Sequence, residues 1–430
     1  MTRALSGLLG LRAADLRALA ERVRGEPGTW TPLRGRIVAV LPFGPSALPP
    51  AAWLAAAQRL GAGVLRLDDV TSGATPPPLS VAVEAARHAD VLVTSHPALG
   101  FARAASELAG VPVVNAGEGD GEDPASGLSL LAAALAAHTQ TGLSADRRSA
   151  PARDRIHVAV CGDLRGSRAA RALLAALAAL DATVLLVPAR GRDLPEDALQ
   201  RLARRTGRRP LRFEARTMRS LLDMVDTVLL APEEAPQLPL FQEVGVPPGE
   251  SERRARREVE DTDVLLVAPT DGAPERLVAA PFRGRGRAVP EGVVHRTHPG
   301  ALAALLEFAA AAGAEPGRAE AELFRDAALR YRSPYGLRCR NGACIAAREP
   351  AHVLPDFLLL TRSPADLECL HCGTRTRARH VGSSEALRHH PVGSADAAKV
   401  LDANLVLFRT PAEALEAGFS PSRRGHGRPA

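Results

Sequence analysis

The sequence predicts an α/β protein with two doubly wound parallel-sheet lobes and a small, β-rich C-terminal domain. Strand-like apolar runs alternate with helical stretches over the first 300 residues, and a polar segment at 144–155 interrupts this alternation once. Alternation at such spacing is typical of parallel sheets with helices on both faces. Beyond residue 333 the pattern changes to short apolar runs separated by turns, and four of the five cysteines lie there.

The composition is that of a globular protein. The 430 residues suffice for two or three domains, and 46% hydrophobic with 24% charged residues excludes a disordered chain. No apolar run reaches the ~18–20 residues that span a bilayer, and the N-terminus lacks the apolar stretch of a signal peptide. We therefore expect a cytoplasmic protein.

Residues 1–140 should form the first lobe. An amphipathic helix over 12–24 places Leu16, Leu19 and Val23 on one face. The other elements expected here are strands at 36–43, 63–67, 90–95 and 111–116 and helices at 50–60, 79–88 and 127–138.

Residues 141–300 should form the second lobe, in which the same alternation restarts. The expected elements are strands at 157–164, 182–189, 227–232 and 263–269 and a helix at 167–180. The charged stretch 244–261 is expected at the surface. Two α/β lobes of similar size favour a ligand cleft between them.

The rest of the chain divides into three segments. Residues 301–334 read as a helical connector, because 299–313 and 316–331 are rich in Ala, Leu and Glu. Residues 335–385 hold the cysteine pairs in a β-rich zinc-binding domain. Residues 386–430 read as a small C-terminal module that ends in a disordered tail, SPSRRGHGRPA.

The four C-terminal cysteines form two closely spaced pairs, Cys339-x4-Cys344 and Cys369-x2-Cys372, separated by 24 residues. Such pairs on two turns suit a tetrahedral four-thiolate zinc site. Two disulfides are the alternative, which the missing signal peptide disfavours. Cys161 lies in an apolar run and should be a buried core thiol.

An acidic turn follows the last expected strand of the first lobe. In residues 115–127, NAGEGDGEDPASG, four carboxylates fall within six residues: Glu118, Asp120, Glu122 and Asp123. A turn between a strand and a helix N-terminus offers N–H groups and a positive helix dipole, which suit an anion. We interpret the carboxylates as a sign that nothing negative binds there.

The first 300 residues resemble the catalytic chain of the aspartate and ornithine carbamoyltransferase family. The resemblance rests on RLGAGVLRL, DVLVTSHPALGFA, VPVVNAGEGDGEDP and VAVCGDLRGSRAARALL. It implies two doubly wound lobes, with carbamoyl phosphate bound mainly by the first and the amino acid bound mainly by the second.

The motifs of that family are largely replaced in this chain. The S-T-R-T-R phosphate loop aligns with 46–50, where only Ser46 is kept. The histidine of the H-P-T-Q element becomes Asp123, and the lysine-bearing loop aligns with 71–80, which has no cation. In the amino-acid half, only Arg168 keeps a substrate-binding residue type. The resemblance therefore implies vestigial substrate-binding positions at Ser46, Asp123 and Arg168 and no catalytic residue.

A site for the carbamoyl phosphate dianion must supply cations and N–H donors. We expect no carbamoyl transfer without them, and interpret the chain as a structural or regulatory subunit linked to pyrimidine biosynthesis. Two alternatives stay open: an active aspartate carbamoyltransferase with a rebuilt site, and a binding protein for another small molecule or nucleic acid. The basic region 331–430 would serve nucleic acid, which we rank last because aromatic residues are scarce.

The sequence segments around the cysteines resemble the zinc domain of the regulatory chain of aspartate carbamoyltransferase. LRCRNGACIAAREP and LECLHCGTR carry this resemblance. It implies a structural zinc ion and docking onto a catalytic chain. The expected partners are therefore an active carbamoyltransferase catalytic chain and further copies in a trimer-based oligomer, with no membrane involved. The histidines at 380, 389, 390 and 426 read as solvated.

Overall fold

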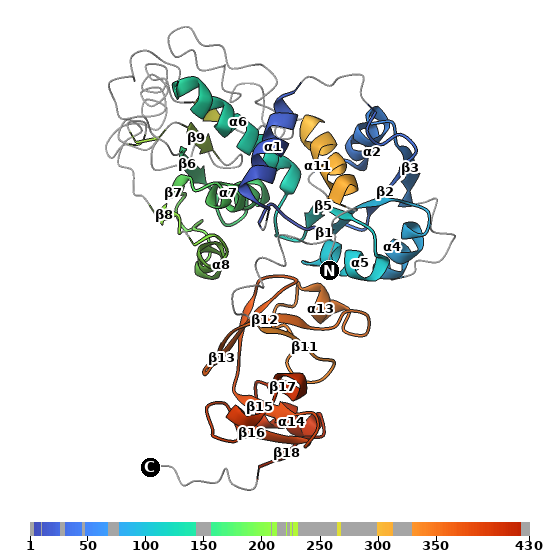
Figure 1. Ribbon diagram of the computed structural model, residues 1–430. Coiled ribbons are helices and arrows are strands. Elements are labelled where there is room, and N and C mark those ends of the chain that lie inside the picture. Colours follow the sequence, from blue (N-terminus) through green and yellow to red (C-terminus); the bar gives the residue numbers. More distant parts are fainter. Residues whose placement is uncertain are drawn as a thin grey trace.

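The computed structural model describes residues 4–9, 11–25, 31–44, 48–67, 77–142, 156–207, 209–212, 221, 224–225, 227–230, 265–267, 299–312 and 329–422. Two five-stranded and two four-stranded sheets lie in this part of the chain. Figure 1 shows two helix-covered units side by side, with the small β-rich units below them. The predicted fold class is confirmed. Within the described residues, no helix has the length and apolar character needed to cross a bilayer.

The first lobe is built on a parallel sheet of order β1-β5-β4-β2-β3. Its strands are β1 (Ala4–Leu5), β2 (Ile37–Pro42), β3 (Gly63–Arg66), β4 (Val91–His96) and β5 (Val113–Glu118). Its helices are α1 (Ala13–Arg24), α2 (Pro50–Arg59), α4 (Pro78–Ala86) and α5 (Phe101–Ala109). The chain turns to opposite sides of the sheet between β2 and β4, so ligands of such a fold bind at the carboxyl ends of these strands.

The second lobe has a parallel sheet of order β10-β9-β6-β7-β8. Its strands are β6 (His157–Gly162), β7 (Thr183–Pro188), β8 (Leu211–Arg212), β9 (Thr227–Leu230) and β10 (Leu265–Val267). Helix α6 (Pro124–Gly142) leads into this lobe, where α7 (Arg168–Ala179) and α8 (Glu196–Thr206) follow. Helices α6 and α7 approach closely at Gly127, where a Cβ would lie 2.4 Å from the Cβ of Ala172.

One apolar core joins the two lobes. Helix α11 (Pro299–Ala312) follows the second lobe in the chain but packs beside α1 and α2, where it buries Leu302, Leu305 and Leu306. The expectation of a helix through residue 331 is wrong at its end. Leu329–Arg332 form strand β11, because they pair in antiparallel register with the next strand. Residues 313–328 lie outside the described part.

Two antiparallel sheets follow. The first, which with α13 (Ile345–Arg348) forms the four-cysteine domain, contains β11, β12 (Asp356–Arg362), β13 (Ala365–Cys369) and β14 (Arg375–Ala378). The second contains β15 (His380–Ser383), β16 (Arg388–Pro391), β17 (Leu405–Phe408) and β18 (Ser420–Pro421), with two 3-10 turns, Ala397–Lys399 and Asp402–Asn404, and helix α14 (Pro411–Glu416).

The second small sheet differs from the expected module at both ends. Strands β15 and β16 form a hairpin, which spans the expected boundary at residue 386 and places the start of this unit at His380. Strand β18 pairs with β16 in parallel, so the segment expected to be a disordered tail is ordered at its start. Residues 423–430 lie outside the described part.

Candidate functional site

The acidic turn lies where β5 ends and α6 begins, at the edge of the first sheet that binds ligands in folds of this kind. Two helix N-termini, those of α5 and α6, meet at this edge. The first N–H groups of a helix have no partner inside the helix. The chemistry of the site therefore depends on which groups accept hydrogen bonds from them.

Glu118 binds the N-terminus of α5. Its side chain is buried, with 4% of its surface exposed. One carboxyl oxygen accepts a hydrogen bond from the N–H of Gly100 at 2.7 Å, and the other accepts one from the N–H of Ala102. The carboxyl of Glu118 thus occupies the donors that an external anion would need.

Burial sets the protonation of Glu118. Removal from water raises the pKa of this carboxyl to about 7, although the two N–H bonds act in the opposite direction. The neighbouring carboxyl of Glu122 raises the pKa further. Near neutral pH the group is therefore divided between its acid and carboxylate forms.

Glu118→Gln should remove a pH dependence of stability. The folded-state pKa of about 7 exceeds the ordinary value of 4.5, so the Glu118 contribution is complete below pH 4.5 and is lost as the pH rises through 7. This gap corresponds to about 3 kcal/mol. Chemical denaturation of both proteins from pH 4.5 to 8 should show the advantage of the wild type over Glu118→Gln shrinking by roughly that amount. Parallel curves would contradict this role of Glu118.

The next two carboxylates of the turn also bind groups of the chain itself. Glu122 accepts a hydrogen bond from the N–H of Leu8 at 2.7 Å and so fixes the N-terminal segment to the turn. Asp123 caps α6, because its two oxygens accept hydrogen bonds from the hydroxyl and the N–H of Ser126 at 2.7 and 3.2 Å. With 3% of its surface exposed, Asp123 serves the helix and is closed to solvent.

Arg168, at the start of α7 in the second lobe, forms two hydrogen bonds with this turn. Its guanidinium donates to the carbonyl of Gly119 at 3.2 Å, and its own carbonyl accepts from the N–H of Asp123 at 3.2 Å. The neighbouring Arg171 pairs with the exposed Asp120 at 3.8 Å. The structure thus brings Arg168 and Asp123 together. Ser46 lies outside the described residues.

His96, at the end of β4, provides no positive charge at neutral pH. Its ring stacks on Phe101 with 4.2 Å between the ring centres, and its Nδ1 accepts a hydrogen bond from the N–H of Ala98 at 2.9 Å. Burial lowers the pKa of His96 to about 4. Burial thus favours the neutral ring, so an anion at this edge would find no imidazolium.

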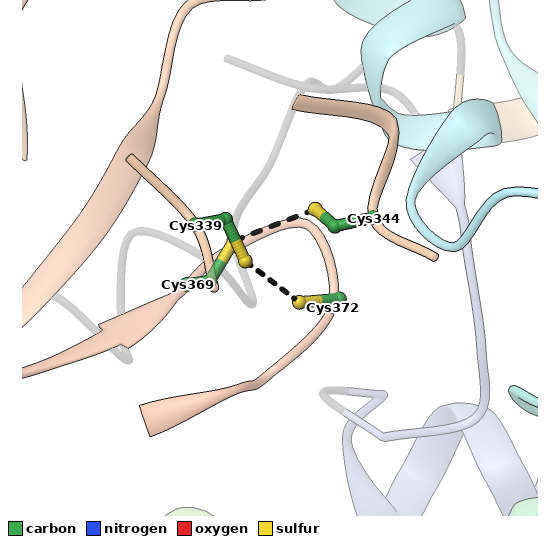
Figure 2. Close-up of side chains that lie close together, drawn as sticks. All are labelled: Cys339, Cys344, Cys369 and Cys372. Atoms are coloured by element: carbon green, nitrogen blue, oxygen red, sulfur yellow. Dashed lines mark hydrogen bonds between the residues drawn. The ribbon is translucent and has the colours of Figure 1, made fainter. Parts of the chain in front are cut away.

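The four cysteines of the C-terminal pairs converge on one point (Figure 2). The Sγ atoms of Cys339 and Cys372 are 3.5 Å apart, those of Cys344 and Cys369 are 3.8 Å apart, and all four lie within 4.8 Å of one another. Sulfur atoms around a tetrahedral ion at about 2.3 Å are separated by about 3.8 Å, so the set fits a zinc-sized ion. These separations are far above the ~2.05 Å of a disulfide.

The fifth cysteine is separate from this cluster. Cys161 lies in β6, fully buried, and burial raises the pKa of its thiol. It behaves as the core residue that its apolar surroundings predict.

The four-cysteine domain packs directly on the first lobe. Leu99, just before α5, forms a β-bridge to Cys344. Its N–H donates to the carbonyl of Ala343 at 2.8 Å, and its carbonyl accepts from the N–H of Ile345 at 2.9 Å. A single apolar core continues across the contact and includes Phe101 on one side and Phe357 on the other. The four-cysteine domain thus docks on the first lobe of its own chain.

An ion network surrounds this contact. Asp356 of β12 is fully buried, receives a bidentate bond from Arg330, and lies 3.7 Å from the guanidinium of Arg103 on α5. Glu107, also on α5, lies 3.4 Å from Arg330 and 3.3 Å from Arg332. The charges that join the two units come from segments more than 220 residues apart in sequence.

The histidines of the last sheet differ from the expected solvated state. His389 is 5% exposed, and its ring lies edge-on to that of His380 with 5.2 Å between centres. Burial lowers the pKa of both rings. The interpretation of His389 as solvated is therefore wrong. His426 lies outside the described residues.

Comparison with known proteins finds aspartate carbamoyltransferases, both by sequence and by fold. No family model matches the chain. Over 196 residues it is 34% identical to the aspartate carbamoyltransferase catalytic subunit of Methanosphaerula palustris, which is 44% of this chain and 61% of that protein. The subunit of Thermoplasma acidophilum is 32% identical over 184 residues, 42% of this chain and 56% of that protein. The chain thus spans 56–61% of the length of these relatives.

Solved structures agree with the sequence relatives. The catalytic subunit of M. jannaschii aspartate transcarbamoylase superposes with a TM-score of 0.50 at 20% identity, over 72% of this chain and 97% of that one. The Trypanosoma cruzi enzyme in complex with carbamoyl aspartate and phosphate gives a TM-score of 0.52 at 20% identity, over 71% and 95%. These likenesses establish the fold.

Proposed function

We propose that this chain, a sequence relative of aspartate carbamoyltransferase catalytic subunits with their fold, is a non-catalytic structural or regulatory subunit linked to pyrimidine biosynthesis. One observation carries the proposal. The carboxyls of Glu118 and Asp123 take up N–H donors at the N-termini of α5 and α6. These donors lie at the edge of the sheet where a carbamoyltransferase-like fold would bind its anionic substrate.

The charges around this edge support the proposal. A carbamoyl phosphate site needs cations and free N–H donors together. Here Arg168 donates to a peptide carbonyl, Arg171 pairs with a carboxylate, and His96 is neutral. The segment that aligns with the family's phosphate loop carries no arginine. Each hydrogen bond to a charged group contributes about 1.5–3 kcal/mol, so several such losses leave little affinity for a dianion.

The metal of the four-cysteine domain is, in this proposal, a structural zinc ion. Cys339, Cys344, Cys369 and Cys372 would hold it, and four thiolates fill a tetrahedral ion without leaving a position for water or substrate. The zinc would supply folding energy to the domain. The residues around it hold the domain on the first lobe.

A chain with a filled anion site and a structural metal site is better suited to a role in subunit assembly than to catalysis. We propose trimer-based oligomers of this chain alone or with an active carbamoyltransferase catalytic chain. The face of α5 is covered by the chain's own four-cysteine domain. A partner chain would therefore use other surfaces of the lobes. Light scattering of the purified chain, alone and mixed with an active catalytic chain, tests this part; a strict monomer in both samples would count against it.

An activity assay tests the catalytic part of the proposal. The zinc-loaded chain should form neither carbamoyl aspartate from carbamoyl phosphate and aspartate nor citrulline from carbamoyl phosphate and ornithine. An active aspartate carbamoyltransferase subunit is the control for the assay. Turnover that Arg168→Ala abolishes would favour the alternative of a rebuilt active site.

A further inference from the structure

The loop that carries the second cysteine pair contacts both lobes. It comprises Cys369–Cys372 and the flanking Glu368 and Gly373, and is called the clamp loop below. Figure 1 shows the four-cysteine domain below the two lobes. We propose that the clamp loop fixes the second lobe against the first, so that metal occupancy controls the angle between the lobes. The proposal rests on the metal site of the proposed function, but not on the absence of catalysis.

His371 provides the attachment to the first lobe. It packs against Gly100, the residue before α5, where a Cβ would lie 2.5 Å from the Cβ and 2.8 Å from the backbone oxygen of His371. Gly100 has φ of +83°, so both its conformation and this close approach require glycine. The backbone of the clamp loop thus rests directly on the start of α5.

Glu368 provides the attachment to the second lobe. Its side chain is 2% exposed and accepts a hydrogen bond from Arg204 of α8, while Arg201 lies 3.6 Å from its other oxygen. The guanidinium of Arg201 also covers Gly373, where a Cβ would lie 2.5 Å from Nη1. Beside them, Arg375 donates to Gln200 at 2.7 Å.

These contacts come from one face of α8. Gln200, Arg201 and Arg204 are spaced so that a helix presents them on the same side. Burial of a carboxylate is favourable only while its cationic partners remain. Moving α8 away from the clamp loop would deprive Glu368 of these two cationic partners. The ion pairs therefore join α8 of the second lobe to the four-cysteine domain.

Metal binding shapes the clamp loop itself. Cys369 and Cys372 hold the two ends of the turn on which His371 lies, and Glu368 precedes the first of them in the chain. Without the ion, four thiols at these separations have no common partner, and the turn loses the constraint that ligation supplies. Loss of the metal should then release both attachments together.

The test compares the distance between the lobes in four samples. Fluorophores are placed through unnatural amino acids at Ser80 and Arg190, which are exposed in the first and second lobes, so the cysteines stay free. The samples are the zinc-loaded chain, the same chain after chelation, the zinc-loaded Arg201→Ala/Arg204→Ala variant, and zinc-loaded Arg209→Ala. Arg209 pairs with Glu196 at 2.8 Å within the second lobe, which makes it a matched control.

Single-molecule energy transfer should give one narrow distance for the zinc-loaded chain and for Arg209→Ala. Chelation and the double variant should both lose that single distance and give a broad distribution. The double variant must still contain one zinc per chain, which separates loss of the clamp from loss of the metal. An unchanged narrow distance in the zinc-containing double variant would overturn the clamp. Catalytic turnover would overturn the proposed function without affecting this result.

Discussion

Cys344→Ser should release the metal and unfold the four-cysteine domain, the largest stability loss expected from one substitution in this chain. Cys344 is fully buried, is the N-cap of α13, and forms the bridge to Leu99 of the first lobe. Ligation of a structural zinc ion is worth about 10–16 kcal/mol in small domains, and removing one thiolate forfeits much of it. The zinc content by mass spectrometry should fall from one per chain to near zero.

Unfolding of that domain should also expose the first lobe. The apolar core that includes Phe101 and Phe357 spans both units, so limited proteolysis should cut the variant within residues 329–378 and then near α5. Cys161→Ser is the control, since Cys161 lies in β6 away from the cluster. It should keep one zinc per chain and a single unfolding transition. A Cys344→Ser protein with full zinc content and wild-type stability would contradict the four-thiolate site.

Asp356→Ala should cost about 3–5 kcal/mol of unfolding free energy, because it leaves the buried guanidinium of Arg103 without this carboxylate. Asp356 is fully buried between Arg330 of its own sheet and Arg103 of α5. Urea denaturation, followed by fluorescence, measures this loss. The effect should appear in the stability of the contact between the four-cysteine domain and the first lobe.

Asp366→Ala provides the matched control for this prediction. Asp366 lies in the same sheet and forms a bidentate bond with Arg377 at 2.6 and 3.0 Å, but the pair is exposed. Exposed pairs contribute about 0.2–1 kcal/mol, so this variant should remain close to wild type. Similar losses for both variants would show that Asp356 has no special role in the contact.

Eight of the ten described strands of the lobes could be predicted, because their apolar runs stand out in the sequence; the two-residue strands β1 and β8 were not expected. The VLVTS run of β4 is buried along its length, as its composition indicates. Helices α5 and α8 were not expected, although both are strongly amphipathic and this pattern could have revealed them. Arg103 of α5 and Arg204 of α8 meet their partners in the four-cysteine domain, and those partners are distant in sequence.

Strand β11 shows how tertiary pairing overrides local preference. The residues before it are rich in Ala, Leu and Glu and predict a helix that would continue to Tyr331. Instead Tyr331 pairs opposite Phe357, and its hydroxyl accepts a hydrogen bond from the N–H of Leu407. Both partners lie in later strands, so the sequence around β11 could not reveal its conformation.

The metal cluster and the acidic turn differ in what their sequences reveal. The spacing of the cysteines alone was enough to predict that the four sulfur atoms lie together, because few sites other than metal sites use two such pairs. For the turn, the sequence located the carboxylates but not the groups that they bind. The expectation was only that nothing negative binds beside these carboxylates. In the structure Asp123 caps α6, and Glu118 takes the anion's place at α5.

The central claim is that the chain's own carboxyls fill the anion site of the first lobe. Calorimetric titration of the zinc-loaded chain with N-(phosphonacetyl)-L-aspartic acid, the compound held by the Trypanosoma cruzi enzyme in one solved complex, tests it most directly. We expect no saturable heat, with or without prior addition of inorganic phosphate. Saturable binding of one molecule per chain would show that the site accepts a dianion and would contradict the account.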